Sequence, residues 1–242
     1  MNGPRSAVAF LTPLGGAATP VPSALAWFPA VGAAMGGLLG LLWWSTEHIW
    51  PAFVAAAIVV GADLALTGLL HIDGLVDAAD GLLPHLDRDR RLAVMREPSV
   101  GAFGIASGTV VLLARYAALG SVRPSILLLT GIWCGSRAVM AVIPSLVPYA
   151  RADTGGLATS FLAKGRVVPG VVAAVTGTAG LLCATMLWHP LAGAVAALSG
   201  LAAVALVMWF AVRRIGGFTG DVLGAAGVVF ETVALIVAAA RW

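Results

Sequence analysis

Charged side chains are scarce in this 242-residue sequence. Only 10% of the residues are Asp, Glu, Lys or Arg, whereas 60% are hydrophobic, and the mean hydropathy is +0.98. This composition argues against an ordinary soluble domain and is typical of an integral membrane protein. The net charge is only +3, and the basic residues are scattered between apolar runs rather than gathered in one tract, so we expect no nucleic-acid partner.

Cysteines are few, and the familiar catalytic signatures are missing. Cys134 and Cys183 lie in hydrophobic segments without the spacing of a metal site or a disulfide framework, so we expect both to be packing residues. The sequence has no Walker loop, dinucleotide fingerprint or zinc-protease helix. Near the N-terminus, Arg5 precedes only a short apolar stretch that Pro13 interrupts, so no cleaved signal peptide is predicted.

Long apolar runs, in contrast, are plentiful. Seven of them approach the length of about 20 residues that a helix needs to cross a bilayer. We therefore predict an all-α fold, a polytopic integral membrane bundle of about seven transmembrane helices, with residues 1–242 forming a single membrane-embedded domain. The predicted spans are Ala24–Trp44, Phe53–Leu70, Gly101–Leu119, Ser125–Val147, Val168–Trp188, Leu191–Val212 and Val222–Ala240.

Glycine spacing in the first span indicates close helix packing. Gly32, Gly36 and Gly40 recur every four residues and form a small-residue stripe that lets two helix backbones approach.

The basic residues divide unevenly between the two sides that seven spans would create. Arg123 and Arg241 fall on one side, and by the positive-inside rule the other side is cytoplasmic. The segments 71–81, 148–167 and 213–221 would then share one face. The basic residues predicted on the cytoplasmic side are Arg5, Arg88, Arg90, Arg91, Arg96, Arg151, Lys164, Arg166, Arg213 and Arg214.

Four ionisable residues remain inside the predicted spans: Asp63, Arg115, Arg137 and Glu231. A buried charge in hydrocarbon costs at least a few kcal/mol, so such residues normally face a polar cavity or one another. Snorkelling toward the membrane surface is the competing explanation, and it suits Arg115, near a span end, better than Arg137.

A polar segment, residues 71–81 (HIDGLVDAADG), carries three of the eleven acidic residues. Asp73, Asp77 and Asp80 are spaced i, i+4 and i+7, so on a helix their carboxylates share one face. Hard oxygen ligands in this arrangement suit Mg²⁺, which usually shares its coordination shell with water and substrate phosphates. The alternative is a solvated helix start where acidic residues are favoured by the helix dipole.

Two further segments favour a phosphate-containing substrate. Arginines in residues 87–97 could pair with phosphate oxygens, although a basic helix resting on anionic lipid headgroups explains them as well. In residues 216–221 (GGFTGD), Gly217, Thr219 and Gly220 could offer an anion the N–H groups of a helix start, and Asp221 could add a metal ligand. Helix capping by Thr219 or Asp221 is the competing explanation.

In order and separation, these motifs resemble the adenosylcobinamide-GDP ribazoletransferase family, also called cobalamin-5'-phosphate synthase. The resemblance extends over nearly the whole chain and rests on FLTP, AWFPAVGA, HIDGLVDAADG, DRDRRLAVMREPSVGAFG, RYAAL, GSRAVM, PYAR and GGFTGDVLGAA. It implies a multi-pass enzyme of the bacterial cytoplasmic (inner) membrane that joins adenosylcobinamide-GDP to α-ribazole or its 5'-phosphate and releases GMP. It leaves room for a homo-oligomer and for association with other cobalamin-pathway enzymes.

The resemblance also implies roles for individual residues. His71 becomes a general base or its partner, acting catalytically with Asp73, Asp77 and Asp80, and a purely structural role for His71 is the alternative. The metal ligands for Mg²⁺ are these three aspartates, with Asp221 as a weaker candidate. The diphosphate contacts are Arg88, Arg91, Arg96, Arg137 and Arg151.

The chain departs from the family pattern at three places, one of which is residues 14–23, where the chain diverges from the family's usual short Leu-Pro element. Met95-Arg96-Glu97-Pro98-Ser99 stands where Met-Lys-Asp-Ser and a basic residue are expected. Gly227 and Val228 replace a polar residue and a glutamate, which leaves Glu231 either to substitute for that glutamate or to pair inside the bundle.

Two other functions compete with the transferase. A membrane phosphotransferase that uses a CDP-linked alcohol donor would also need an acid-rich helix, but its DGxxDAxR-type pattern is absent because Ala78-Ala79-Asp80-Gly81 contains no arginine. A transporter would also carry charges inside the membrane, but the sequence shows no inverted repeat, and its acidic residues cluster toward one membrane face rather than the midplane.

Overall fold

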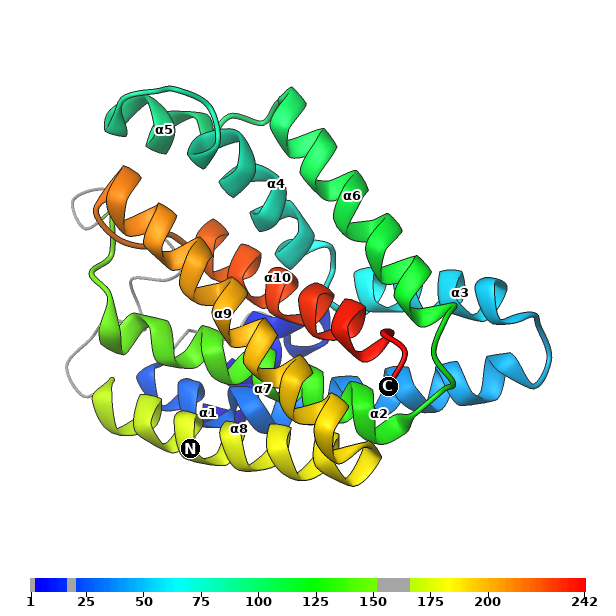
Figure 1. Cartoon of the computed structure of the whole chain (residues 1–242). Coiled ribbons are helices and arrows are strands. Elements are labelled where there is room, and N and C mark those ends of the chain that lie inside the picture. The colour runs from blue at the N-terminus through cyan, green and yellow to red at the C-terminus, as the bar shows by residue number, and fades with distance from the viewer. Residues whose placement is uncertain (1–2, 17–20, 152–165) are drawn as a thin grey trace.

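The computed structural model describes residues 3–16, 21–151 and 166–242. In this part of the chain the regular secondary structure is helical, apart from one isolated β-bridge between Tyr149 and Phe218. Lys164, one of the basic residues predicted on the cytoplasmic side, lies outside these residues. The elements in chain order are α1 Gly3–Leu11, η1 Pro13–Gly15, η2 Pro22–Trp27, α2 Phe28–Glu47, α3 Ala52–Leu66, α4 Leu70–Leu82, α5 Arg88–Val94, α6 Ala102–Leu119, α7 Ile126–Leu146, α8 Val167–Trp188, α9 Pro190–Ile215 and α10 Gly220–Ala238 (Figure 1).

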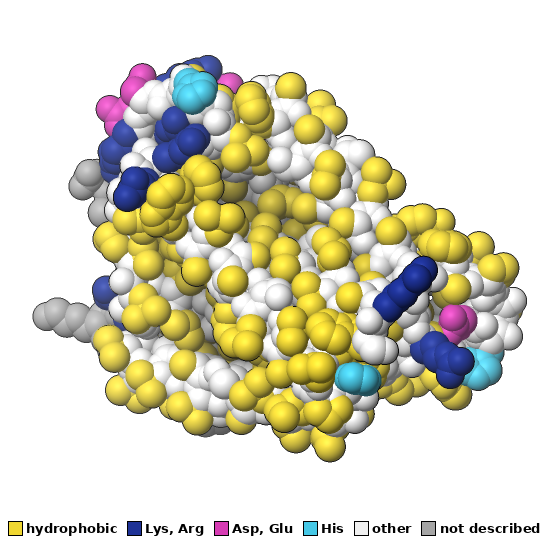
Figure 2. All heavy atoms as spheres, in the orientation of Figure 1, with side chains coloured by type: hydrophobic (Ala, Val, Ile, Leu, Met, Phe, Trp, Pro, Cys, Tyr) yellow, Lys and Arg dark blue, Asp and Glu magenta, His cyan; other side chains and the backbone are white. Residues whose placement is uncertain are grey.

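The helices confirm the polytopic membrane bundle. Six of the described helical segments are long and apolar enough to cross a membrane: η2 with α2, then α6, α7, α8, α9 and α10. Each overlaps one predicted span, with ends that differ by a few residues. Large hydrophobic side chains are exposed along them, as expected for surfaces that face lipid (Figure 2).

The second predicted span, Phe53–Leu70, is wrong as a continuous helix. α3 ends at Leu66, and the chain bends by 87° before α4 begins. Gly68 and Leu69 both have left-handed φ angles, 57° and 64°, which no α-helix can accommodate. The count reaches seven only when α3 and α4 are taken as one broken span.

The glycine stripe of α2 packs against α7, as predicted. A Cβ atom added at Gly40 would lie 2.7 Å from the Cα of Ile126, and at Gly32 and Gly36 it would collide with backbone oxygens of α7. Only glycine allows this approach of the two backbones.

α10 is the central helix of the bundle. It packs against α4, α6, α7 and α9 and lies among them in Figure 1. Its buried residues extend over the whole length of the helix. Residues of α10 therefore contact most of the elements that carry the predicted site.

The described parts of the three segments predicted to share one face, residues 71–81, 148–151 and 213–221, lie together, whereas residues 152–165 are outside the described part of the chain. Arg88 in α5 donates from Nη2 to the carbonyl of Ala150 at 3.0 Å and from Nε to that of Ile215 at 3.1 Å. One arginine thus joins α5 to the chain after α7 and to the end of α9. Figure 2 shows basic side chains gathered at this end of the molecule, with fewer at the opposite end.

Candidate active site

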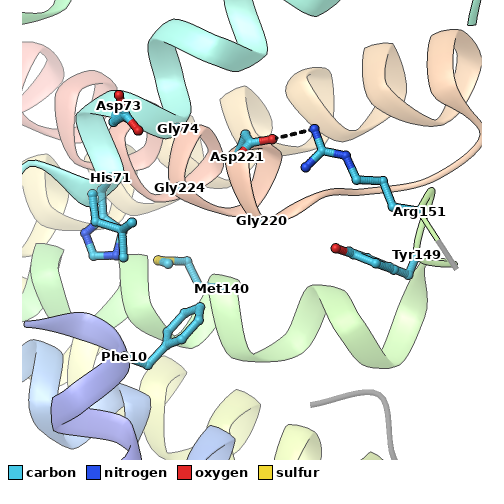
Figure 3. Close-up of a pocket in the computed structure, with 11 residues that line it drawn as sticks. Phe10, His71, Asp73, Gly74, Met140, Tyr149, Arg151, Gly220, Asp221 and Gly224 are labelled. Carbon is cyan, nitrogen blue, oxygen red and sulfur yellow. Dashed lines mark ion pairs between the residues drawn. The ribbon is translucent and has the colours of Figure 1, made fainter. Parts of the chain in front are cut away.

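A pocket of about 170 Å³ lies where the first turns of α4 and α10 meet (Figure 3). Four of its polar residues, His71, Asp73, Arg151 and Asp221, belong to the predicted site. Its lining comprises Phe10, Leu70, His71, Asp73, Gly74, Met140, Tyr149, Arg151, Gly220, Asp221 and Gly224. A larger groove of about 590 Å³ between α7, α8 and α9 has no charged side chain among the described residues that line it.

Two glycines allow α4 and α10 to cross closely beside the pocket. A Cβ atom at Gly74 would lie 2.9 Å from the backbone oxygen of Asp221. A Cβ atom at Gly224 would lie 3.2 Å from the backbone oxygen of His71. This crossing brings the acidic segment of α4 next to the first turn of α10, although the two segments are far apart in the sequence.

The start of α10 is held by a short backbone pairing. Ala150 N–H donates to the Phe218 carbonyl at 2.8 Å, and Phe218 N–H donates to the Pro148 carbonyl at 3.0 Å. Gly217 packs against Pro148 in this pairing and does not line the pocket. The pairing fixes residues 148–151, and with them Tyr149 and Arg151, beside the first turn of α10.

Thr219 caps α10 rather than lining the pocket. Its hydroxyl accepts the Val222 N–H at 3.3 Å and donates to Asp221 Oδ2 at 3.2 Å, and its side chain is fully buried. This is the capping role that the sequence left open for Thr219. Gly220 does line the pocket, and no atom of the described residues lies within 4 Å of an added Cβ, so this helix start is open to an anionic group.

An ion pair crosses the pocket wall between Arg151 and Asp221. Arg151 Nη2 lies 3.0 Å from Asp221 Oδ2, and Figure 3 shows this pair between α10 and the segment that follows α7. Tyr149 lies on the same side of the pocket. Burial raises the pKa of the Tyr149 phenol above its usual range, so the hydroxyl is a hydrogen-bond donor at neutral pH.

Asp73 and Asp77 bring further negative charge to the same place. Asp73 lines the pocket, and the carboxylates of Asp73 and Asp221 both repel that of Asp77, one turn along α4. In the described part of the chain no three His, Cys, Asp or Glu side chains are grouped as a metal site. Mg²⁺ is usually bound by one or two carboxylates together with water and substrate phosphates, so these hard oxygen donors fit it, and the predicted ligation stays a prediction.

Asp80 caps a neighbouring helix. Its two carboxylate oxygens accept the backbone N–H groups of Gly101 at 2.7 Å and Gly104 at 2.8 Å, at the start of α6. Asp80 is buried and does not line the pocket. A carboxylate at a helix start is favoured by the unpaired N–H groups and by the dipole. Its role as a metal ligand stays a prediction.

Of the arginines predicted to contact diphosphate, only Arg151 lines the pocket. Arg88 donates hydrogen bonds to the carbonyls of Ala150 and Ile215 instead. Arg91 is buried and donates from Nη1 to the carbonyls of Gly81 and Leu82, both at 2.9 Å, at the end of α4. Arg96 is exposed in the turn after α5. Two of these arginines therefore bind carbonyl groups at the C-terminal ends of helices: Arg91 at the end of α4 and Arg88 at the end of α9.

The four ionisable residues inside the spans form one cluster, which we call the intramembrane ion cluster. Arg115 lies 2.7 Å from Asp63 and 2.5 Å from Glu231, and Arg137 pairs with the other oxygen of Glu231. All four side chains are buried, so the expectation that they face one another is confirmed and snorkelling of Arg115 is wrong. Glu231 pairs inside the bundle, one of the two alternatives left open for it.

The cluster is completed by neutral hydrogen-bond partners. Trp133 Nε1 donates to Asp63 at 2.9 Å, Ser136 Oγ donates to Glu231 at 2.8 Å, and Arg115 Nε donates to Thr232 Oγ1 at 2.9 Å. Arg137 is therefore engaged in the bundle interior, and its predicted contact with diphosphate is not supported by its position, because its side chain is 1% exposed and does not line the pocket.

His71 lies between the pocket and the ion cluster. It lines the pocket and also a small cavity beside Glu231 and Arg137. The residue is 4% exposed, and neither ring nitrogen has a hydrogen-bond partner among the described residues. The imidazole is therefore held by packing at the boundary between the pocket and the ion cluster.

Several pocket residues have no role predicted from the sequence. Tyr149 belongs to the PYAR motif and Phe10 to FLTP, both parts of the family resemblance. Phe10 stacks on Phe28 with ring centroids 5.6 Å apart, which fixes α1 beside the pocket. Met140 comes from GSRAVM. Membership of these motifs was the signal in the sequence that could have identified the three residues. Their side chains are aromatic or apolar, so their chemistry alone does not indicate a role in the site.

The family model for cobalamin-5-phosphate synthase matches residues 3–239, almost the entire chain and every element of the pocket. The chain belongs to this family. It is therefore a transferase, and the sequence-based resemblance is confirmed.

Named relatives agree with the family assignment. The adenosylcobinamide-GDP ribazoletransferase of Chlorobaculum parvum is 33% identical over 227 residues, which cover 90% of this chain and 85% of the relative. That of Chlorobium phaeobacteroides is 35% identical, with 96% and 95% covered, and that of Deinococcus radiodurans is 37% identical, with 88% and 74% covered. No solved structure matches the chain.

Proposed function

We propose that this member of the cobalamin-5-phosphate synthase family joins adenosylcobinamide-GDP to α-ribazole or its 5'-phosphate. The products are adenosylcobalamin, or its 5'-phosphate, and GMP. The observation that carries this proposal is the family match over residues 3–239, together with the position of the pocket where the HIDGLVDAADG and GGFTGD motifs meet.

The reaction is a phosphoryl transfer. A ribazole hydroxyl attacks the phosphorus on the cobinamide side of the diphosphate, a new P–O bond forms, the anhydride bond breaks, and GMP leaves with the bridging oxygen. The hydroxyl proton passes to a basic group, for which His71 is the candidate in the pocket.

The residues around the pocket can divide the work of this reaction. Arg151 and the open helix start at Gly220 would bind phosphate oxygens, and Tyr149 would donate a hydrogen bond. Asp73, Asp77 and Asp221 would hold Mg²⁺, which supplies charge neutralisation to the diphosphate when bound. Because Arg151 already pairs with Asp221, a phosphate entering here would exchange this contact for its own.

We also propose that the protein lies in the bacterial cytoplasmic membrane with the pocket toward the cytoplasm. The pocket lies beside the ends of α7, α9 and α5, where basic residues such as Arg88, Arg213 and Arg214 gather, and the positive-inside rule places such an end in the cytoplasm.

The direct test uses purified protein in lipid nanodiscs, supplied with adenosylcobinamide-GDP and α-ribazole, with and without Mg²⁺. We expect GMP and adenosylcobalamin to form in equal amounts, only when both substrates and Mg²⁺ are present. α-Ribazole 5'-phosphate replaces α-ribazole in a parallel reaction to find the preferred acceptor. A folded protein that makes no product, or that prefers a CDP-linked alcohol in a donor competition, would overturn the proposal.

A further inference from the structure

A small cavity of about 10 Å³ lies inside the bundle, between His71 and the intramembrane ion cluster. Its polar lining residues are Asp63, Thr67, His71, Arg115, Arg137 and Glu231. A cavity of about this volume holds one water molecule when two or more polar groups face it.

Three buried polar atoms around this cavity lack hydrogen-bond partners among the described residues. They are both ring nitrogens of His71 and Nε of Arg137. His71 is 4% exposed and Arg137 1%, so bulk water does not reach these atoms. An unpaired buried polar group is costly, and natural proteins usually satisfy such groups with an ordered water.

We propose that the cavity binds one water molecule that links His71 to the ion cluster, and that this link makes Arg137 a positioning residue for the active-site imidazole. Arg137 Nε–H donates to the water oxygen, and the water donates one proton to a ring nitrogen of His71 and the other to the Glu231 carboxylate. Because the water binds one ring nitrogen from the side of the ion cluster, the imidazole keeps a fixed orientation toward the pocket.

The two arginines of the cluster differ in how fully their nitrogens are hydrogen-bonded. Arg115 bonds to Asp63, Glu231, Thr232 and the Val228 carbonyl, so each of its terminal groups is used within the protein. Arg137 Nε has no hydrogen-bond partner within the described part of the chain. The second arginine therefore brings a donor to the side of the cluster that faces His71.

The hydration of His71 can be measured without any enzyme assay. The chain has four histidines, so ¹⁵N-histidine labelling of protein in lipid bilayers yields few ring signals, and His71→Gln assigns the one of interest. In water-edited solid-state NMR we expect magnetisation to pass from water to the His71 ring. The absence of transfer in the wild type would overturn the proposal.

Two matched variants separate this water from general disturbance of α10. Val228 lines the cavity, and Val228→Ile adds a methylene there that displaces the water. Val229 lines a different cavity, and Val229→Ile is the control. We expect transfer to the His71 ring to fall several-fold in Val228→Ile and to be unchanged in Val229→Ile. Arg137→Lys, which keeps the positive charge but removes Nε, provides a second way to lose the link.

The positioning role rests on the proposed function and is measured by its kinetics. We expect Val228→Ile and Arg137→Lys to lower kcat by about tenfold or more with little change in KM, since a misplaced catalytic group costs rate rather than binding. Wild-type kcat in variants that have lost the water signal would overturn the positioning role. An inactive wild type with a clear water signal would instead overturn the proposed function and leave the water site standing.

Discussion

Arg151 pairs with Asp221 at 3.0 Å in the wall of the pocket, where Arg151 follows α7 and Asp221 lies in the first turn of α10. We expect Arg151→Ala to lower kcat/KM by about 100-fold, the size typical for removal of one preorganised donor to a developing charge. Arg151→Lys should recover only part of this loss, because lysine cannot present a planar bidentate fork. Initial rates of GMP release at varied donor concentration measure both effects.

The control for Arg151 is Arg123→Ala. Arg123 is exposed in the connection between α6 and α7, away from the pocket, so its loss should leave kcat/KM unchanged. Equal losses in the Arg123 and Arg151 variants would show a general effect of net charge and would contradict a specific contact.

Asp77 is the test of metal binding by α4. We expect Asp77→Asn to reduce turnover by about two orders of magnitude while the protein still inserts and folds, since the substitution keeps the shape and removes only the charge that a metal needs. Chelation of Mg²⁺ should abolish the wild-type activity, and re-addition should restore it. In the variant, half-maximal rate should need more Mg²⁺. Asp89→Asn, an exposed acid in α5, is the matched control.

Full activity of Asp77→Asn at low Mg²⁺ would argue against metal ligation by this helix. The same titration applied to Asp73→Asn and Asp221→Asn would rank the pocket carboxylates by their effect on the Mg²⁺ requirement.

Asp80 should matter for stability. Asp80→Ala leaves the N–H groups of Gly101 and Gly104 without their carboxylate, and an unsatisfied buried donor costs about 1–3 kcal/mol. We expect this loss in the free energy of unfolding, measured by denaturant titration in mixed micelles. A variant of wild-type stability with a raised Mg²⁺ requirement would instead make Asp80 a metal ligand.

The intramembrane ion cluster should be highly sensitive to the loss of one member. Glu231→Gln leaves Arg115 and Arg137 without their shared carboxylate, and breaking a buried pair costs about 3–5 kcal/mol. Glu97→Gln, which breaks an exposed pair with Arg90, should cost less than about 1 kcal/mol. Unfolding curves of the two variants give this comparison, and equal losses would show that the buried cluster adds nothing special.

Much of the architecture could be predicted because hydrocarbon thickness acts directly on sequence. A run of about 20 apolar residues satisfies its backbone only as a helix in lipid, so six of the predicted spans correspond to observed ones. The stripe of Gly32, Gly36 and Gly40 likewise predicted close packing, because small residues at this spacing lie on one helix face. The bend after Leu66 escaped prediction, since Leu69 has no chemistry that marks a left-handed residue.

The site was predictable only in part. Aspartates and arginines near one another indicate phosphate chemistry whatever the fold, and His71, Asp73, Arg151 and Asp221 do meet at one pocket. Yet the same residue types also cap helices, as Asp80 and Arg91 do here. Sequence spacing alone does not distinguish these uses.

By itself, the sequence determined that this protein is a helical membrane bundle, where most of its spans begin and end, and which family it belongs to. The tertiary structure decided the partner of each polar residue. Arg115 and Glu231 are 116 positions apart and nevertheless 2.5 Å from one another. A side chain's role follows from the neighbours that distant segments supply, and these neighbours exist only after α10 has packed against α4, α6 and α7.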